Sequence, residues 1–442
     1  MRITLIMPGV GKKTGEPYVS SWKMEPLALA VLAALSPPDI EVSFYDDRLE
    51  EIPYQEETDL VAINVETYTA QRAYDISSKF RKLGRPVILG GFHPTLMPDE
   101  AIEFADSILV GEAEGVWHQI LEDAKKGRLK KLYISQKNDV LQKVSAKREI
   151  FKGKKYLPIN LIESGRGCKF NCKFCSIASF YKSSYKARDI SEIVNEIKTL
   201  KNKSVFFVDD NIIADPQRAK ELFQALIPLK IDWISQGSIN LANDEQMIKL
   251  MKRSGCLGLL IGFESLNKSN LSQMNKHVNM NYGNYEDALK KFRDVGIAIY
   301  ATFIFGYDLD DADAVKKTLD FAIKQKFFLA AFNHLVPFPG TPLYDDLEKE
   351  GRLLYDKWWL NPEYRFGEIA FRPKLITAEI LSKECFEARK SFYQLNSILR
   401  RSFDFKSNCR NPKMASIFFS LNLLTQKEIV KRQHLPIGKG MD

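Results

Sequence analysis

Three cysteines lie close together in the chain, Cys168, Cys172 and Cys175, with the spacing C-x3-C-x2-C. Three thiolates in one short loop can hold three irons of a 4Fe–4S cluster. Because the loop has no fourth cysteine, the remaining iron would stay open to a ligand that is not protein. An open iron is what a cluster needs to bind and reductively cleave a sulfonium such as S-adenosylmethionine. The spacing therefore predicts an iron–sulfur site with this reactivity.

Two other uses of clustered cysteines fit the sequence less well. A disulfide needs a partner and an oxidising compartment. A structural zinc site needs four protein ligands, and the remaining cysteines, Cys256, Cys385 and Cys409, lie far along the chain. We expect Cys256 to be a small buried residue.

Composition limits the class of protein. With 442 residues, 45% of them hydrophobic, the chain is long enough for two or three domains with sizeable cores. The N-terminal residues read as a buried strand and not as a secretory signal, and no apolar run reaches membrane-spanning length. The net charge of +8 is modest and does not form the basic, aromatic-rich stripe typical of nucleic-acid binding. We expect a monomer in the reducing cytoplasm that binds no nucleic acid.

The first 124 residues alternate strand and helix patterns, which predicts a doubly wound parallel sheet. Expected strands cover 2–7, 41–45, 60–65, 87–89 and 107–110, and expected helices cover 24–35, 70–83 and 116–124. Ligands of such sheets bind at the carboxyl ends of the strands. Turn formers and polar residues gather there, and paired glycines would let the backbone approach a large flat ligand. On these grounds the segment is an α/β ligand-binding domain.

From Pro158 to about residue 345, about six further strand–helix units predict a partial parallel barrel, with its chemistry at the carboxyl ends of the strands. One mouth would then collect the three cysteines and the polar residues that follow each strand. These are Cys168, Cys172, Cys175, Asp209, Asp210, Asn211, Ser238, Asn240, Glu264 and Gly306. Asp209 or Asp210 could instead cap the next turn, and Glu264 could be a partner in an ion pair.

Residues 346–442 give fewer signals. The aromatic residues Trp358, Trp359, Tyr364, Phe366 and Phe371 favour packing of a cap domain over a substrate pocket. The pattern predicts one helix over 377–399, with Thr377 as its N-cap. The apolar run 414–424, flanked by basic residues, is compatible with peripheral contact to a membrane surface, but a packed amphipathic helix is the favoured interpretation.

With Phe174 just before its third cysteine, the cysteine loop resembles the radical S-adenosylmethionine superfamily. In that family the aromatic residue packs near the adenine. Residues 209–211 take the place of the family's Gly-Gly-Glu segment, without its glycines, so only their acceptor atoms carry over. Ser238 and Asn240 stand where the family contacts ribose or carboxylate, and residues 258–264 resemble the adenine-side strand. The resemblance implies S-adenosylmethionine binding by Phe174, Asp209, Asp210, Asn211, Ser238, Asn240, Gly262, Glu264 and Gly306.

Over residues 1–345 the chain resembles the members of this superfamily that carry a Rossmann-like cobalamin-binding domain before the barrel. Cobalamin domains of the D-x-H-x-x-G type ligate cobalt through the histidine, but here the stretch is Asp46-Asp47-Arg48-Leu49-Glu50-Glu51. The lower face of cobalt is then expected to lack histidine, and His93 is as well explained by a loop cap or a contact with the cofactor edge. The alternative is a domain that has lost cobalamin. The resemblance implies cobalamin contacts from Asp46, Asp47, Arg48, Glu66, Thr67, Tyr68, Gly90, Gly91, Phe92, His93, Gly111 and Glu112.

The resemblance implies an enzyme that methylates an unactivated carbon, or phosphorus, of a small-molecule, natural-product or lipid-like substrate. It also implies an external electron donor of the flavodoxin or ferredoxin type. Two alternatives are a cobalamin-dependent enzyme that closes or rearranges a ring, and a redox sensor without catalytic activity. The expected organisation is a cobalamin-binding domain over 1–128, a linker over 129–157, the barrel over 158–345 and a helical domain over 346–442.

Overall fold

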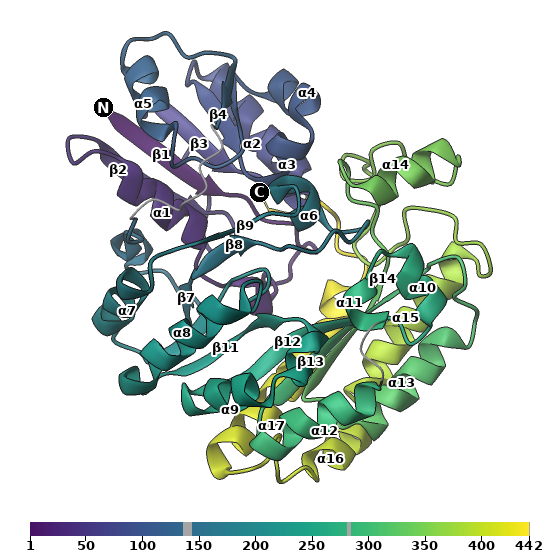
Figure 1. Ribbon diagram of the computed structural model, residues 1–442. Helices are drawn as coiled ribbons and strands as arrows, with labels where there is room; N and C mark the ends of the chain where they lie inside the picture. Colours follow the sequence, from purple (N-terminus) through teal and green to yellow (C-terminus); the bar gives the residue numbers. More distant parts are fainter. Residues whose placement is uncertain (136–143, 281–283, 442) are drawn as a thin grey trace.

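The computed structural model describes residues 1–135, 144–280 and 284–441. Two six-stranded sheets dominate the molecule, one in the N-terminal third and one in the central part, and the C-terminal helices cover the second (Figure 1). All strand pairs within the two large sheets are parallel. The prediction of two parallel α/β units is therefore confirmed.

The first sheet has the strand order β2-β1-β3-β4-β5-β6. This is the doubly wound arrangement in which the chain reverses direction across the sheet between β1 and β3. Its strands are β1 (Arg2–Met7), β2 (Glu41–Asp46), β3 (Leu60–Asn64), β4 (Val87–Gly90), β5 (Ser107–Val110) and β6 (Leu132–Ile134). Its helices are α1 (Leu27–Leu35), α2 (Ala70–Lys82), α3 (Phe92–Leu96), α4 (Pro98–Ala101) and α5 (Trp117–Lys125).

Hydrophobic cores lie on both faces of this sheet. Ala30 of α1 and Trp117 of α5 belong to one core. Tyr74 of α2 belongs to the other. β6 falls in the segment that the sequence suggested as a linker, part of which (136–143) lies outside the described residues. Its short LYI pattern is too brief to be recognised as a strand, yet it pairs with β5 and extends the sheet.

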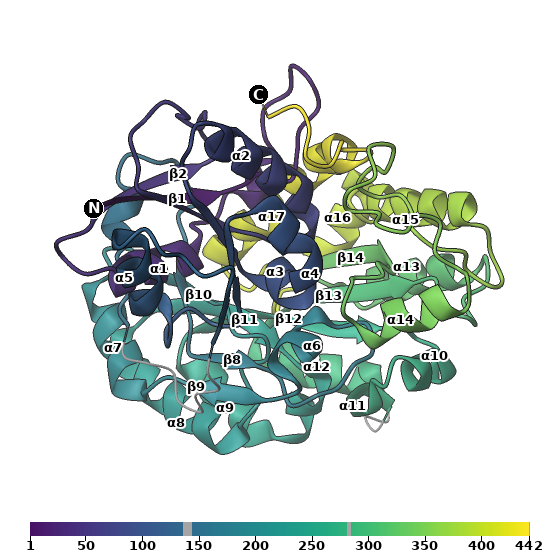
Figure 2. The ribbon, with the colours of Figure 1, turned by 90° about the horizontal axis from the view of Figure 1, so that it is seen from above.

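The second sheet has the order β14-β13-β12-β11-β10-β7 and curves as an open barrel with helices on its outer face (Figures 1 and 2). Its strands are β7 (Asn160–Ile162), β10 (Ser204–Phe207), β11 (Asp232–Gly237), β12 (Cys256–Glu264), β13 (Ala298–Phe305) and β14 (Leu329–His334). The helices that follow its strands are α7 (Ile190–Thr199), α8 (Pro216–Leu226), α9 (Glu245–Arg253), α12 (Tyr285–Val295) and α13 (Ala314–Lys324).

Short elements at the carboxyl ends of these strands carry much of the chemistry. An antiparallel pair, β8 (Gly165–Gly167) and β9 (Tyr185–Ala187), encloses the cysteine loop and the helix α6 (Ser176–Tyr181). Two small helices, α10 (Lys268–Gln273) and α11 (His277–Met280), follow β12.

The C-terminal region is helical: α14 (Pro342–Lys349), α15 (Ala378–Phe392), α16 (Leu395–Ser402) and α17 (Pro412–Arg432). Thr377 caps α15, as expected, by accepting a hydrogen bond from the backbone N–H of Ile380. The prediction of a single helix over 377–399 is wrong, because Gln394 adopts an extended backbone conformation that separates α15 from α16. The neighbouring Tyr393 hydroxyl bonds the backbone of Ala330 in β14, which fixes the break.

The C-terminal region also ties the two sheets together. Trp358 and Trp359 are fully buried against the first sheet's helices, and the Trp359 indole donates to Glu100 at 3.0 Å. The packing interpretation of the aromatic residues is thus confirmed. The last residues return to the N-terminal loop, where Gly438 N donates to Val10 O at 2.7 Å (Figure 2). Among the residues that the structure describes, no helix combines the length and apolar character needed to cross a membrane.

Candidate active site and cofactor cavity

The cysteine loop lies at the carboxyl end of the barrel strands, between β8 and α6. Cys175 is the N-cap of α6, and its backbone N–H donates to Cys172 O at 3.1 Å, which closes the turn. Burial raises the pKa of the Cys172 thiol to about 11. Burial also raises the pKa of Cys175, although backbone N–H groups of Ala178 and Ile177 oppose this by stabilising its thiolate.

The three thiols suit a polynuclear cluster better than a single ion. Within the described ranges, no three His, Cys, Asp or Glu side chains converge on one point that could hold a lone metal. The Cys168 and Cys175 thiols nevertheless lie near enough to Cys172 to raise the pKa of its thiol further by charge repulsion. Three cysteine thiolates close together in one loop are the kind of ligands that hold a 4Fe–4S cluster. The residues present therefore fit a 4Fe–4S cluster held by the three cysteines.

A buried ammonium group stands beside these thiols. The Lys276 side chain lies 2.9 Å from the Glu264 carboxylate and lowers the pKa of Cys172 and Cys175. Burial opposes the charge on Lys276, but Glu264 and Cys172 outweigh it and raise its pKa. Glu264 ends β12 with φ of 61°, in the left-handed region, at a point where the strand register shifts. Glu264 thus forms an ion pair, as the alternative interpretation of the sequence suggested, but its partner Lys276 was not predicted.

Gly262 makes this ion pair possible. A Cβ at this position would lie 2.0 Å from the Glu264 carboxylate oxygen and 3.3 Å from the Lys276 nitrogen. Any side chain would therefore displace the pair. Lys276 itself follows β12 by a dozen residues in a polar segment, and nothing in its sequence context marks it as a site residue.

The acidic row after β10 fastens the cysteine hairpin to the barrel. Asp209 is fully buried and accepts hydrogen bonds from the backbone N–H of Ser164, at 2.9 Å, and from its hydroxyl. Asp210 accepts from Gly167 N at 2.7 Å. Burial raises the pKa of Asp209 to about 7 and that of Asp210 to about 6. Neither carboxylate caps the following turn, because both bind the residues that precede Cys168.

The next residues along the mouth form a chain of polar contacts. The Asn211 amide lies 3.9 Å from the Cys168 sulfur and 3.3 Å from the Ser238 hydroxyl, which donates to Asn240 at 2.6 Å. The structure therefore brings the residues predicted on β10 and β11 together with the first cysteine.

Two further predicted residues flank this site. Phe174 packs against the barrel core. Gly306, with φ of 112°, follows β13 and donates its N–H to Asp310 at 2.9 Å. Asp310, whose pKa burial raises to about 6, also accepts from Tyr307 N and from Asn270. Sequence reasoning did not identify Asp310 as part of this mouth.

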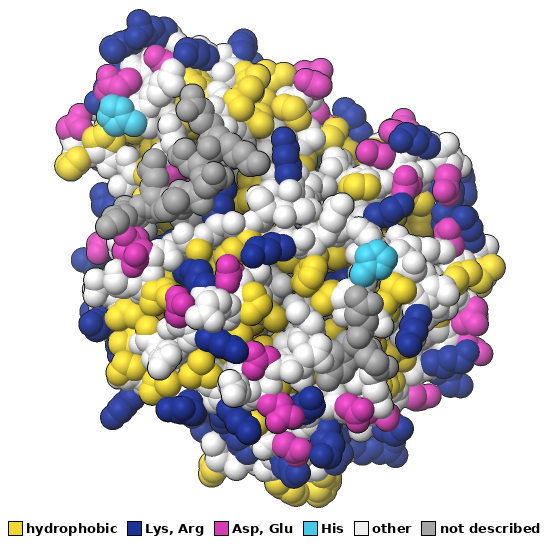
Figure 3. Space-filling model, viewed as in Figure 1, with side chains coloured by type: hydrophobic (Ala, Val, Ile, Leu, Met, Phe, Trp, Pro, Cys, Tyr) yellow, Lys and Arg dark blue, Asp and Glu magenta, His cyan; other side chains and the backbone are white. Residues whose placement is uncertain are grey.

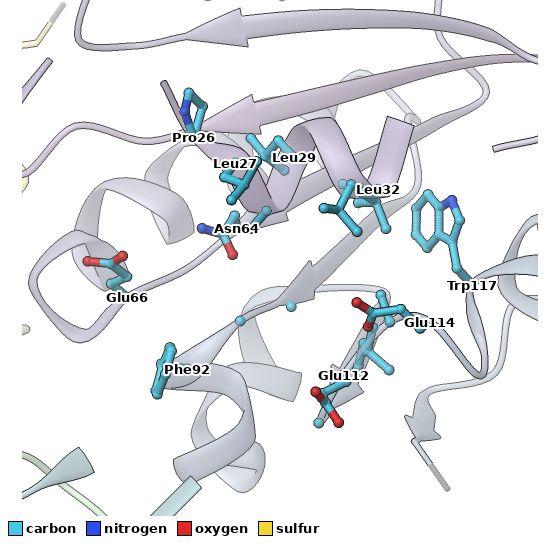
Figure 4. Close-up of a pocket in the computed structure, with 18 of the residues that line it drawn as sticks. Pro26, Leu27, Leu29, Leu32, Asn64, Glu66, Phe92, Glu112, Glu114 and Trp117 are labelled. Atoms are coloured by element: carbon cyan, nitrogen blue, oxygen red, sulfur yellow. The ribbon is translucent and has the colours of Figure 1, made fainter. Parts of the chain in front are cut away.

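A cavity of about 470 Å³ lies where the carboxyl ends of the first sheet face the barrel (Figure 4). One wall is the apolar face of α1, including Leu27 and Leu32, and the opposite side is formed by strand ends without side chains at Gly90, Gly91 and Gly111. The barrel contributes Leu161, Glu163, Arg166 and Val208, and α6 contributes Phe180 and Tyr181. An apolar wall opposite glycine backbone that carries no side chains suits a large, flat ligand.

The polar side of the cavity is held by one guanidinium. Arg166 of β8 lies 3.0 Å from Glu112, 2.6 Å from Glu114 and 2.8 Å from Glu163. Lys186 adds a second cation to Glu112. Figure 4 shows Glu112 and Glu114 side by side, across the cavity from α1. Arg166 and Glu163 were visible in the sequence beside the cysteine motif, but only the fold shows that they reach the first domain.

The residues predicted to contact cobalamin divide into two groups. Glu66, Gly90, Gly91, Phe92, Gly111 and Glu112 line the cavity. Desolvation of the Glu66 carboxyl at the cavity wall raises its pKa. The Phe92 ring lies 4.5 Å from that of Phe180 on α6, so the cavity and the cysteine loop share one helix.

The other six do not line the cavity: Asp46, Asp47, Arg48, Thr67, Tyr68 and His93. Their polar groups have partners within the protein. Arg48 pairs with Asp46 at 2.6 Å, and Arg72 pairs with Asp47 at 2.8 Å. Tyr68 packs among aromatic rings that include Trp358.

His93 is also buried away from the cavity. Its ring nitrogens lie 3.3 Å from the Thr67 hydroxyl, 3.1 Å from Tyr74 and 3.0 Å from Glu100. Both nitrogens thus have partners. A polar run after a strand cannot distinguish side chains that turn into the domain from those that face its ligand.

Comparisons with known proteins agree with this architecture. Residues 162–322 match the Radical SAM superfamily model. Bacteriochlorophyllide d C-12(1)-methyltransferase of Chlorobaculum tepidum is 31% identical, with 85% of this chain and 84% of that protein aligned. Bacteriochlorophyllide d C-8(2)-methyltransferase of the same organism is 28% identical, with 92% and 94% aligned.

Solved structures share the fold. The cobalamin-dependent S-adenosylmethionine radical enzyme OxsB superposes with a TM-score of 0.67 at 14% identity, covering 97% of this chain and 71% of OxsB. The radical S-adenosylmethionine methyltransferase TsrM from Kitasatospora setae gives 0.62 at 17% identity, covering 79% and 76%. The sequence relationship and the cysteine loop together show that this chain belongs to the radical S-adenosylmethionine family, among its methyltransferases, and its fold is that of the cobalamin-dependent enzymes TsrM and OxsB.

Proposed function

We propose that this enzyme methylates an unactivated carbon on a large, mostly apolar substrate of the tetrapyrrole or lipid class. The substrate class is supported by the two relatives whose names specify methylation of bacteriochlorophyllide d. A hopanoid C-2 methylase of Rhodopseudomonas palustris, 25% identical over 75% of this chain and 66% of that protein, supports the same apolar character.

The observation that carries the proposal is the position of α6. Cys175 caps its first turn, and Phe180 and Tyr181 at its other end line the cavity. A helix of six residues spans about 9 Å. Ligands held by the cysteines and by the cavity would therefore face each other across a short gap. When bound, the cluster supplies the electron that cleaves S-adenosylmethionine, and cobalamin carries the methyl group.

The chain's own residues hold and shield these groups. Cys168, Cys172 and Cys175 would bind the cluster, and the α1 wall and the glycine strand ends would enclose cobalamin. Lys276 places a positive charge beside the thiolates, which offsets part of their mutual repulsion. Arg166 pairs with the three carboxylates of the polar wall and, together with Lys186, offsets most of their charge where an apolar ligand would bind.

The experiment is an anaerobic turnover assay. Reconstituted enzyme is mixed with dithionite, S-adenosylmethionine bearing a deuterated methyl group, and bacteriochlorophyllide d. Expected products are deuteromethylated substrate, with S-adenosylhomocysteine and 5′-deoxyadenosine in equal amounts. 5′-Deoxyadenosine without S-adenosylhomocysteine would instead favour ring chemistry, and neither product would favour a sensor.

A matched pair of variants controls the assay. Replacing the three loop cysteines by Ala should remove the iron and all cleavage. Cys409→Ala, which changes a half-buried cysteine outside the loop, should leave both intact. Cleavage by the triple variant would show that the cluster is held elsewhere.

A further inference from the structure

A row of large apolar side chains projects into solvent along α16. Leu395, Leu399 and Phe403 are 59%, 51% and 64% exposed, and Phe405 just beyond them is 71% exposed. The spacing of four residues places Leu395 and Leu399 on one face of the helix, and Phe403 follows as its C-cap. Single exposed apolar residues are ordinary on protein surfaces, but a contiguous row at the surface marks a site of interaction.

This surface, Leu395–Phe405, is held rigidly by the fold. Arg401, on the opposite face of α16, is fully buried and donates hydrogen bonds to Phe327 O at 3.0 Å, Phe392 O at 2.8 Å and Asn422 at 2.9 Å. Asn408 donates to Arg401 O at 3.0 Å, which fastens the loop after α16. The exposure of the apolar row therefore results from packing beneath it and not from a loose segment.

The segment that carries this surface is mainly basic. Residues 394–413 contain five basic residues and a single acidic one, Asp404. Asp404 is buried and bonded to Ser407, whereas Arg400, Lys406 and Lys413 are exposed. Lys406 pairs with Asp294 at 2.7 Å and Lys413 pairs with Asp232, so Arg400 is the cation that faces solvent directly beside the apolar row. Figure 3 shows hydrophobic side chains at the lower edge of the molecule, where α16 and α17 lie in Figure 1, with basic side chains and some acidic ones around them.

The surface lies at the end of the barrel opposite the cysteines. Lys326, just before β14, donates to Phe403 O at 2.7 Å, and Arg410 bonds Gly296 O just before β13. Both are at the amino-terminal ends of barrel strands, whereas the cysteine loop and the cavity lie beyond the carboxyl ends. Anything bound to the α16 surface would leave the mouth uncovered.

We propose that Leu395–Phe405 docks the enzyme on a lipid bilayer that carries negative charge. Phe403 and Phe405 would enter the boundary between headgroups and acyl chains, and Arg400 would meet anionic headgroups. A projecting apolar row with basic neighbours matches this partner in shape and charge. The segment 414–424 does not serve this purpose: it forms the packed helix that the sequence favoured, with Met414 and Phe418 buried against Ala298, Phe328 and Ile398.

The test is flotation of the full-length protein with vesicles of phosphatidylcholine containing 30% phosphatidylglycerol, compared with phosphatidylcholine alone. Wild-type protein should bind the anionic vesicles, and binding should fall as salt is raised. F403S/F405S should bind at least tenfold more weakly. Ile134→Ser is a matched control, since Ile134 is 63% exposed on β6 of the first sheet. It should bind like the wild type.

Two outcomes would overturn the proposal. Equal vesicle binding by wild-type and F403S/F405S proteins would show that the surface is not the membrane contact. A wild-type dimer that becomes monomeric on F403S/F405S substitution, measured by light scattering without lipid, would assign the surface to a second copy of the chain. Because the surface is remote from the cysteines, S-adenosylmethionine cleavage in solution should be unchanged in F403S/F405S, which separates this test from that of the proposed function.

Discussion

The barrel mouth and the cavity of the first sheet occupy equivalent places, the carboxyl ends of parallel strands, but they are constructed in different ways. At the mouth, polar side chains bind one another: Asp209 binds Ser164 and Glu264 binds Lys276. In the cavity, the essential feature is space, enclosed by the apolar face of α1 and by glycine backbone. One site is thus organised by contacts that are present, the other by side chains that are absent.

This difference determines how each site should respond to substitution. At the mouth, removing one polar side chain leaves its buried partner without a hydrogen bond or a counter-charge. Both the local charge and the stability of the protein should therefore change. On the apolar and glycine walls of the cavity, removing a group costs little, but adding atoms excludes the ligand. The comparison can be tested by substitutions of opposite kinds.

The largest effect is expected from filling the cavity. Leu32 of α1 lines it and faces toward Trp117 in Figure 4. Leu32→Trp should lower cobalamin retention after anaerobic reconstitution by tenfold or more, while iron and sulfide contents stay at wild-type values. Ala34→Trp, on the same helix but outside the lining, is the control. Equal corrin content in Leu32→Trp and wild type would contradict the assignment of the cavity.

A change in the pH dependence of stability is expected at the mouth. Burial raises the Asp209 pKa from 3.8 to about 7, so the folded protein holds this proton at pH values where the unfolded chain has lost it. Stability from this group is therefore full below about pH 4 and is lost as pH rises to about 7. Asp209→Asn should remove this decline in the free energy of unfolding, which is a few kcal/mol at most. The measurement is denaturant unfolding of the cluster-free protein at a series of pH values.

The control for this measurement is Asp320→Asn on the exposed side of α13. In this variant the free energy of unfolding should change with pH as it does in the wild type. An identical slope in wild type and Asp209→Asn would show that Asp209 is ionised in the folded protein and that its contacts with Ser164 outweigh burial.

A smaller effect is expected on the cluster. The ammonium of Lys276 stabilises added negative charge, and Glu264 weakens that influence. Lys276→Met should lower the midpoint potential of the reconstituted cluster by roughly 60 mV, a factor of ten for a one-electron couple. Glu264→Gln should raise it, and the exposed Lys268→Met should leave it unchanged. Potentials are measured by spectroscopic titration without S-adenosylmethionine, so a shift seen only with that ligand present would assign Lys276 to substrate binding.

The sequence predicted the mouth better than the cavity, for a physical reason. Cys168, Asp209 and Asn211 follow short apolar strands, and parallel strands bring their carboxyl ends to one place. Lys276 and Asp310 were missed because they reach the mouth from segments beyond the strands. In the first sheet, a position after a strand does not show which way a side chain turns. Arg48 and His93 therefore looked like ligand contacts, yet they pair inside the domain.

The smallest effect is expected from His93, a histidine of the first domain and therefore a candidate for cobalt ligation. Burial opposes the charge of Glu100, but hydrogen bonds from His93 and Trp359 outweigh it and lower the Glu100 pKa to about 2. His93→Ala should therefore destabilise the fold by about 1–3 kcal/mol, because it leaves a buried carboxylate without one donor. It should not alter the paramagnetic resonance spectrum of bound cob(II)alamin, which should lack imidazole nitrogen coupling in both proteins. Coupling that is present in the wild type and lost in His93→Ala would place this histidine on cobalt and would require the loop after β4 to rearrange when the cofactor binds.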